Sequence, residues 1–292
     1  MRTDCHTHIT SPEPGTLLTR LGREPFSAED LLRRMDAEAV DRSVVMPIDC
    51  PESAYVGTAG TLDVLRATRP HRDRLIPFTG VDPRSQHNSA TGDLGPLLAA
   101  GQDAGARGVG EVTANIPLDD PRLVNLCRHA GGLGLPVLIH VAHQLGEVYG
   151  PADDPGLPRL ERLLQLCPET HIIGHAQSFW AEVSGDVRPE QRGGYPTGPV
   201  TPGRLHALLA TYPNLHADLS AGSGFNALSR DPEHGKAFLK QFSHKLILGT
   251  DRFAPSHPLP PILDWVRSAG LDPAELAAIE NDNLERILGP AS

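Results

Sequence analysis

Lysine is nearly absent from this sequence of 292 residues. Its three lysines, Lys236, Lys240 and Lys245, lie in one short stretch, and arginine carries most of the positive charge. The formal net charge is −10, from 26 basic and 36 acidic side chains. Proteins that bind nucleic acids usually carry a clear positive charge, so we expect neither a nucleic acid nor a membrane as a partner. A small-molecule substrate fits this composition, and a homo-oligomer stays open.

Paired cysteine motifs and long apolar runs are also missing. The four cysteines, at positions 5, 50, 127 and 167, form no C-x-x-C pair. Arg2 and Asp4 interrupt the start of the chain, and no apolar segment typical of a secretory signal follows. No run of about 18 apolar residues is long enough to span a membrane. We therefore expect free thiols and a cytoplasmic protein.

Short runs rich in valine and isoleucine alternate with longer stretches of helical pattern. We expect eight strands, near Thr3–His8, Ser43–Ile48, Leu75–Val81, Gly108–Val112, Val137–Val141, His171–His175, Leu215–Leu219 and Leu246–Gly249. Helix starts are predicted at Ser27 with Asp30 and at Asp120 with Pro121. Eight such units in this length predict an α/β fold, a (β/α)8 TIM barrel, over residues 1–292 as a single domain. An open doubly wound sheet has the same alternation.

Two connections are unusually long and rich in glycine. Residues 176–202 carry Phe179, Trp180 and Tyr195, and we expect this loop to form a lid over the site, or else to dock on a second subunit. Residues 220–231 are expected to be irregular as well, and Gly222-Ser223-Gly224 there is a weak match to a phosphate-binding loop.

Residue types that bind metals stand at the ends of the predicted strands. His6 and His8 are two apart on the first strand, so their side chains point to one face together with Asp4. His140 and His175 each end an apolar strand, and Asp251 follows the eighth strand. Active sites of (β/α)8 barrels form at the carboxyl ends of the strands. The pattern therefore predicts a metal site there.

This pattern resembles the amidohydrolase superfamily, in particular its amidohydrolase-related branch. The resemblance rests on the H-x-H pair, on the stretches PVLIH, IIGHA and LGTD, and on the closing segment Asn283-Leu284-Glu285-Arg286-Ile287-Leu288. It implies a metal-bearing barrel in which His6, His8, His140 and Asp251 bind the metal. It also implies that His175 binds a second metal or orients the water or the substrate.

The fourth strand distinguishes branches of that superfamily. Many members with two metals bridge them by a carboxylated lysine there, which is excluded because no lysine precedes position 236. Glu111 occupies the strand instead, and some members look similar, with a bridging glutamate. The alternative is that Glu111 pairs with Arg84 or Arg252 near the mouth of the pocket.

The expected cofactor is a divalent metal, zinc first, as one or two ions, with Mn²⁺ or Fe²⁺ as alternatives. Asp251 and His175 are the predicted catalytic residues, with Asp251 moving the proton. Asp4 is predicted to fix a histidine tautomer, or else to cap the strand start. Arg84, His143 and Trp180 are predicted to contact substrate, although Trp180 could equally anchor its loop.

The expected function is metal-dependent hydrolysis of a small C–N, ester or lactone substrate. The same branch contains non-oxidative decarboxylases, which resemble aminocarboxymuconate semialdehyde decarboxylase in their ligands. A TatD-like phosphoesterase, also with a glutamate on the fourth strand, is a third reading, and a non-enzymatic metal-binding scaffold is the last. Glu111 favours hydrolysis, because a second metal assists water activation more than decarboxylation.

Overall fold

The computed structural model describes residues 1–11, 22, 24–52, 57–257 and 261–290, and eight parallel strands form its centre. The strands are β1 (Thr3–Thr7), β2 (Arg42–Val45), β3 (Leu75–Pro77), β4 (Val109–Val112), β5 (Val137–His140), β6 (Ile172–His175), β7 (Leu215–Asp218) and β8 (Leu246–Ile247). They follow chain order in a sheet β1-β2-β3 and a sheet β4-β5-β6-β7-β8. All eight predicted strands are therefore confirmed.

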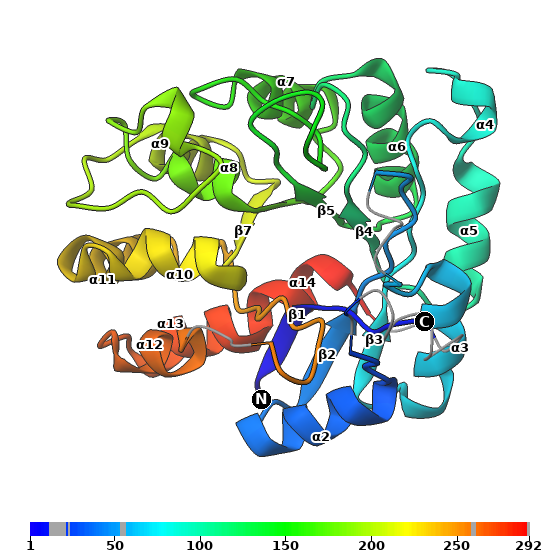
Figure 1. The fold of residues 1–292 in the computed structure, drawn as a ribbon, viewed down its shortest axis with the longest axis horizontal. Helices are drawn as coiled ribbons and strands as arrows, with labels where there is room; N and C mark the ends of the chain where they lie inside the picture. The colour runs from blue at the N-terminus through cyan, green and yellow to red at the C-terminus, as the bar shows by residue number, and fades with distance from the viewer. Residues whose placement is uncertain (12–21, 23, 53–56, 258–260, 291–292) are drawn as a thin grey trace.

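Backbone hydrogen bonds join the two sheets at both seams. The N–H of Cys5 on β1 donates to the Leu248 carbonyl beyond β8 at 2.9 Å. At the other seam, the N–H of Thr79 beyond β3 donates to the Gly108 carbonyl before β4 at 2.9 Å. Parallel bridges, Thr7 with Arg252 and Thr79 with Val109, lie at the same two places. This is the predicted (β/α)8 architecture, seen in Figure 1 with its helices arranged around the strands.

The helices follow the strands in the order expected of βα units. They are α2 (Ala28–Glu38), α3 (Thr61–Thr68), η2 (Arg69–His71), α4 (Ser85–Asn88), α5 (Gly95–Asp103), α6 (Pro121–Gly132), α7 (Pro158–Leu166), α8 (Gln177–Ala181), η3 (Pro189–Gln191), α9 (Arg204–Thr211), α10 (Ala221–Ser229), α11 (Pro232–Gln241), α12 (Ile262–Ser268), α13 (Pro273–Ala277), η4 (Ala278–Asp282) and α14 (Asn283–Leu288). Ser27 and Asp30 form the predicted capping box of α2. Asp120 accepts from the Arg122 N–H and caps α6 as predicted.

The last helices close one end of the strands. Leu284, Ile287 and Leu288 of α14 pack in the same apolar cluster as Cys5, Val44, Ile173 and other strand residues. Figure 1 shows α14 beside β1, so elements from the start and the end of the chain lie near each other. This packing fills the interior of the barrel at the amino ends of the strands. The metal-type residues gather at the other end, the carboxyl ends of the strands.

The predicted irregular loop at 220–231 is wrong, because most of it is helix α10. Its glycines serve packing instead of breaking the helix. A Cβ on Gly224 would lie 2.3 Å from the Leu219 carbonyl oxygen, and one on Gly222 would lie 2.9 Å from the Tyr195 hydroxyl. Small residues are thus needed where α10 approaches the backbone of β7 and the loop that follows β6.

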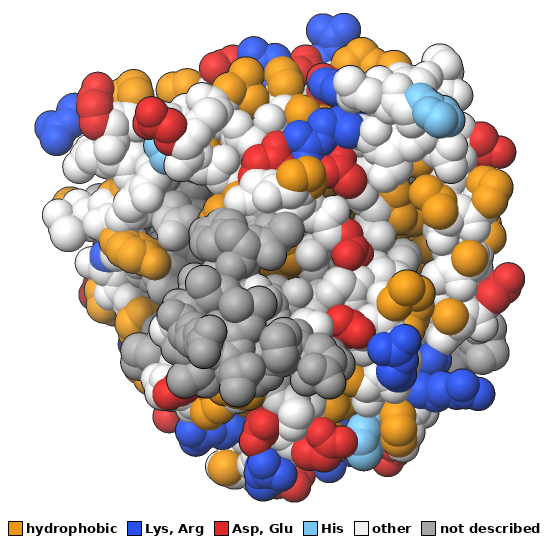
Figure 2. All heavy atoms as spheres, turned by 45° about the vertical axis from the view of Figure 1, so that its right-hand side comes forward, with side chains coloured by type: hydrophobic (Ala, Val, Ile, Leu, Met, Phe, Trp, Pro, Cys, Tyr) orange, Lys and Arg blue, Asp and Glu red, His pale blue; other side chains and the backbone are white. Residues whose placement is uncertain are grey.

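The described surface mixes charges of both signs. On the face in Figure 2, acidic and basic side chains alternate with scattered apolar ones around the grey region. In the part of the chain that the structure describes, no helix combines the length and the apolar character needed to cross a membrane.

Candidate metal centre

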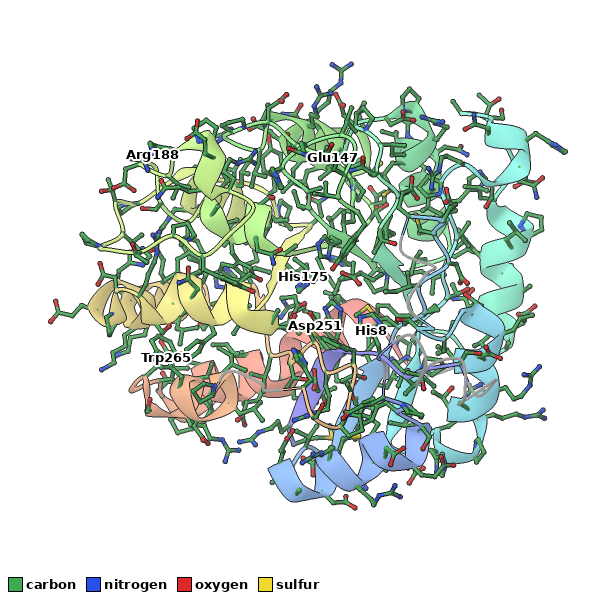
Figure 3. All side chains as sticks on the ribbon, in the orientation of Figure 1. His8, Glu147, His175, Arg188, Asp251 and Trp265 are labelled. Atoms are coloured by element: carbon green, nitrogen blue, oxygen red, sulfur yellow. The ribbon has the colours of Figure 1, made fainter. Side chains whose placement is uncertain are left out.

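Three of the predicted donors meet at the carboxyl ends of β1 and β8. The Nε2 atoms of His6 and His8 lie 3.0 Å apart, and each lies 3.5 Å from Asp251 Oδ1. Asp251 has a left-handed backbone, with φ of 58°, which aspartate tolerates better than most residues. Its N–H donates to the His6 carbonyl at 2.8 Å, which holds the loop after β8 against β1. Figure 3 shows His8, Asp251 and His175 gathered near the centre of the molecule.

Glu111, His140 and His175 form a second group that overlaps the first. His140 Nδ1 donates to Glu111 Oε1 at 2.7 Å, and His175 Nε2 lies 3.9 Å from the same oxygen. The other oxygen, Glu111 Oε2, lies 3.5 Å from His8 Nε2 and 3.8 Å from His6 Nε2. The structure therefore brings all six predicted metal-binding residues together, with Glu111 between the two groups.

Asp218, at the end of β7, is part of the site and was not predicted. Its Oδ2 accepts from His6 Nδ1 at 2.7 Å and from His175 Nδ1 at 2.9 Å, and the side chain is fully buried. Ser220 Oγ donates to the same oxygen at 2.6 Å. These bonds fix both imidazoles with Nε2 facing the cluster. The sequence held one signal for Asp218, because this aspartate stands near the end of the predicted strand Leu215–Leu219.

Asp4 does not orient a histidine ring, so that prediction is wrong. Its Oδ1 accepts from the N–H groups of His6 and Thr250, and its Oδ2 accepts from the Thr250 hydroxyl. Asp4 therefore holds the backbone of β1 against the segment after β8. The Nδ1 of His8 instead donates to the Met46 carbonyl at 3.0 Å.

The electrostatics of the cluster favour charged groups in a buried place. Burial opposes the charged form of His6, but the charge of Asp251 and the bond to Asp218 raise its pKa well above the usual range. Burial likewise opposes ionisation of Glu111, yet the charge of His140 lowers the pKa of that carboxyl well below its usual value. Burial lowers the pKa of His140 itself, and Glu111 offsets this in part. The lowered pKa of Glu111 favours the ionised form of this carboxyl, which attracts positive charge.

The alternative partners considered for Glu111 bind elsewhere. Arg84 forms ion pairs with Glu52 at 2.5 Å and Asp82 at 2.6 Å, and Arg252 pairs with Glu38. Within the described residues, no arginine or lysine forms an ion pair with Glu111. Its titratable neighbours are the imidazoles of His140, His8 and His175.

The aromatic residues of the loop 176–202 divide into buried and exposed ones. Phe179 is fully buried beneath Gly174. Trp180 is 2% exposed and donates from Nε1 to the Asp218 carbonyl at 2.9 Å. Trp180 thus has the geometry of a loop anchor. Tyr195 is 54% exposed and lies against the first turn of α10. Only Tyr195 among these three keeps the exposure that a lid would need.

Two further side chains belong to the segment between β5 and α7. The ring of Tyr149, which was not predicted, lies 4.4 Å from that of His140, centroid to centroid, and is 38% exposed. His143, predicted to contact substrate, lies against Gly193 of the long loop, where a Cβ would approach its ring to 2.6 Å. Tyr149 is an exposed aromatic beside a metal-type residue, and only the three-dimensional fold reveals this.

The donor set fits a divalent transition metal. The structure groups His6, His8 and Asp251 in one set and Glu111, His140 and His175 in another, with the ligand atoms of each set within 4.8 Å of one another. Imidazole with carboxylate suits zinc, iron or manganese. The Nδ1 atoms of His6, His8 and His175 are engaged by oxygen atoms, which leaves Nε2 for an ion.

Comparison with known families agrees with this geometry. The family model described as Amidohydrolase matches residues 3–289. This chain belongs to the Amidohydrolase family. The Amidohydrolase match spans all eight strands and every residue of the metal-type cluster. No curated protein matches the sequence.

Solved structures show the same fold as this Amidohydrolase family member at low identity. An uncharacterised TIM-barrel protein from Bordetella bronchiseptica is 18% identical, with a TM-score of 0.62. A probable 2-pyrone-4,6-dicarboxylic acid hydrolase from Acinetobacter baumannii is 16% identical, with a TM-score of 0.60. The 5-carboxyvanillate decarboxylase of Sphingomonas paucimobilis is 14% identical, with a TM-score of 0.64. Each comparison covers 98% of this chain and 98% of the other.

Proposed function

We propose that this protein is a metal-dependent hydrolase that acts on a small C–N, ester or lactone substrate. One observation carries the proposal: Glu111 lies between two overlapping sets of donors, 3.5 Å from His8 and 3.9 Å from His175. Such an arrangement offers places for two ions that share a carboxylate. Two ions assist the activation of water, which hydrolysis requires.

One ion would be held by His6, His8 and Asp251. A second ion would be held by Glu111, His140 and His175. When bound, a divalent metal lowers the pKa of water toward about 7 and polarises a carbonyl oxygen. Zinc is the first candidate, with manganese and iron as alternatives, because the donors are imidazoles and carboxylates.

Asp251 is the proton carrier in this proposal. Its side chain is 23% exposed, whereas those of His6, His8, Glu111 and His175 are 5% exposed or less. It is therefore the most open of these carboxylates to an entering substrate. Asp251 would accept a proton from the attacking water and return it to the leaving group. His175, held by Asp218, would orient the water or the substrate.

Substrate contacts are proposed from the residues around the centre. His143 lies beside the long loop, and the ring of Tyr149 lies against that of His140 at a tilt of 43°. Arg84 stays a candidate, although Glu52 and Asp82 already offset its charge. A contact from Trp180 would require its loop to move. Tyr195 is the residue through which the loop would act as a lid.

Decarboxylation is the competing function. It needs one metal and no attacking water, so Glu111 would not be required as a ligand. A phosphoesterase is supported less, because among the described residues no lysine or arginine forms an ion pair with the cluster, and such a cation commonly stabilises phosphoryl charge.

The discriminating experiment assays the zinc-loaded protein against lactones, esters and amides, and separately against aromatic carboxylates with detection of CO2. We expect hydrolysis, and a loss of about 10²-fold or more in Glu111→Gln. The exposed Glu169 provides the matched control, Glu169→Gln, which should act as wild type. Release of CO2 that persists in Glu111→Gln, with no hydrolysis of any ester, lactone or amide, would replace this proposal by the decarboxylase.

A further inference from the structure

Two of the four free cysteines meet in the outer layer of helices, outside the metal-type cluster. Cys127 lies on α6 and Cys167 directly follows α7, and both are buried in the same apolar cluster. The other two have different neighbours, because the thiol of Cys5 donates to Asp218 and that of residue 50 donates to residue 52. Neither Cys127 nor Cys167 belongs to a donor set. The metal centre therefore does not use this pair.

Hydrogen bonds hold the segment after α7 against one face of α6. The Thr170 hydroxyl donates to the Cys127 carbonyl at 2.7 Å. The Cys167 thiol donates to the Val124 carbonyl at 3.6 Å. Val124 and Cys127 are three residues apart, so they share a face of the helix. Asn214 Nδ2 also donates to the Cys167 carbonyl at 3.1 Å. These contacts bring both sulfur atoms to one junction between α6 and the end of α7.

The two thiols contact each other, and their chemical roles differ. The Cys127 thiol donates a hydrogen bond to the sulfur of Cys167, which raises the pKa of Cys127 and lowers the pKa of Cys167. The guanidinium of Arg128 also favours the thiolate of Cys167, and its Nε donates to the adjacent Leu166 carbonyl at 3.3 Å. The thiolate is the reactive form of cysteine. Cys167 is therefore the nucleophile of the pair, and Cys127 is placed to react with it next.

Cys167 lies just beneath the surface. It is 2% exposed, but Arg128, Pro168 and Glu169 around it are exposed. Local opening at the end of a helix costs less free energy than opening of the core. A molecule as small as hydrogen peroxide can reach the sulfur through such an opening. Cys127 is fully buried, so an oxidant that enters here meets Cys167 first.

We propose that Cys127 and Cys167 form a reversible disulfide when the protein meets hydrogen peroxide, which makes this pair a modification site. The Cys167 thiolate attacks one peroxide oxygen and becomes a sulfenic acid, and the other oxygen takes up a proton and leaves as water. The Cys127 sulfur then loses its proton, attacks the sulfenic sulfur and displaces a second water. Two thiols are oxidised to one disulfide, and one peroxide is reduced to two waters. The site is independent of the proposed hydrolysis.

The cross-link requires little rearrangement of the chain. The sulfur atoms of a disulfide are about 2.05 Å apart, and thiols in contact reach this separation by small rotations about their Cα–Cβ bonds. The backbones on both sides are held by the bonds from Thr170 to Cys127 and from Asn214 to the Cys167 carbonyl. The disulfide would join α6, which leads into β5, with the segment that leads into β6.

The test treats the protein as purified with a small excess of hydrogen peroxide and then blocks free thiols with N-ethylmaleimide in mildly acidic denaturant. Trypsin cuts beside arginine, so the two cysteines fall in the separate peptides 123–128 and 163–192. We expect mass spectrometry to find these peptides joined, two hydrogen atoms lighter than their sum, and separated again by dithiothreitol. Cys50→Ser is the matched control and should form the same link.

Two further variants separate the steps. In Cys127→Ser the sulfenic acid of Cys167 has no thiol partner, so dimedone should trap it. Arg128→Gln should slow formation of the disulfide about threefold, because the charge that favours the thiolate is lost. Arg69→Gln, which also removes an exposed arginine, should react as wild type.

Three results would each overturn the proposal. They are free thiols at both positions in the treated wild type, a link from either cysteine to another part of the chain, and no dimedone on Cys167 in Cys127→Ser. If Cys127→Ser does not fold, the peptides of wild type and Cys50→Ser decide alone.

Discussion

Asp251 is the donor side chain whose removal should separate catalysis from folding. The amide of Asp251→Asn cannot accept a proton, while the imidazoles of His6, His8 and His175 would still converge on the place proposed for the ion. We expect the fold and some metal binding to persist and turnover to fall about 10²–10⁴-fold. Steady-state kinetics on any substrate found for the protein measures this.

The control for that variant is Asp73→Asn, an exposed aspartate outside the cluster. It should keep full turnover. Activity of Asp251→Asn within about threefold of wild type would remove Asp251 from the general-base role, because general-base loss costs far more.

Asp218 should control metal affinity, although it binds no metal in this account. Its carboxylate fixes the Nδ1 atoms of His6 and His175. In Asp218→Asn one amide group replaces an acceptor that serves both rings, so we expect metal affinity to fall about 10–100-fold. Competition with a chromophoric chelator measures the change.

Asp4 is the comparison, because it is also buried but contacts only backbone groups and Thr250. Asp4→Asn keeps an acceptor for both N–H donors and should keep most of the metal affinity. An equal loss of affinity in both variants would show that burial, and not the bond to the imidazoles, explains the role of Asp218.

At the residue scale, the sequence predicted which metal-type side chains converge better than it predicted the residues that hold them in place. His6, His8, His140, His175, Glu111 and Asp251 all converge, because the carboxyl ends of parallel strands meet at one face. Asp218 obeys the same rule but comes from a strand where no ligand was expected. Which carboxylate orients a ring depends on angles between strands, and the sequence does not contain them.

At the scale of elements, the contact between β6 and α8 is tight. A Cβ on Gly174 would lie 2.2 Å from the ring of Phe179, which is fully buried. We expect Gly174→Ala to lower the free energy of unfolding by about 1–3 kcal/mol, because an overpacked core must shift. Denaturant unfolding measures this loss.

The double variant Gly174→Ala/Phe179→Leu provides the internal control. Leucine leaves room for the added methyl group, so the two substitutions should cost less together than the sum of their separate effects. If the two losses of unfolding free energy are strictly additive, Gly174 is required for its backbone conformation and not for its contact with Phe179.

Elements with regular periodicity were predictable, and those shaped by contacts were not. Leu160, Leu163 and Leu164 have the spacing of one face of a helix, and all three are buried on α7. The segment of α10 contains Gly222 and Gly224, which are typical of loops. Gly222 is required by Tyr195 of the long loop, and Gly224 by the backbone of Leu219 just before the helix. Phe179 and Trp180 were expected in a lid or a docking loop, with a loop anchor as the alternative for Trp180, and both belong to the core.

At the scale of the whole molecule, the barrel depends on contacts between its first and last elements. Arg2 Nε donates to Glu280 Oε1 at 3.2 Å, and Arg267 Nε donates to the same oxygen at 2.8 Å. Arg2 is 6% exposed, so its charge is nearly removed from water. We expect Glu280→Gln to lower the free energy of unfolding by about 1–3 kcal/mol.

Calorimetry measures the unfolding free energy of this variant and of Glu285→Gln. The partner of Glu285 is Arg42, whose side chain is 20% exposed. The loss should be smaller there, because exposed pairs contribute little. A larger loss in Glu285→Gln than in Glu280→Gln would contradict the importance of the contact between β1 and η4.

The central claim is that six side chains from the carboxyl ends of four strands and from the segment after β8 form a binding site for a divalent metal. Elemental analysis of protein purified without chelator tests it most directly. The account predicts about one or two ions of zinc, manganese or iron per chain, with the content lost in His6→Ala/His8→Ala and kept in Glu169→Gln. A metal-free protein that takes up none of Zn²⁺, Mn²⁺ and Fe²⁺ on addition would contradict it.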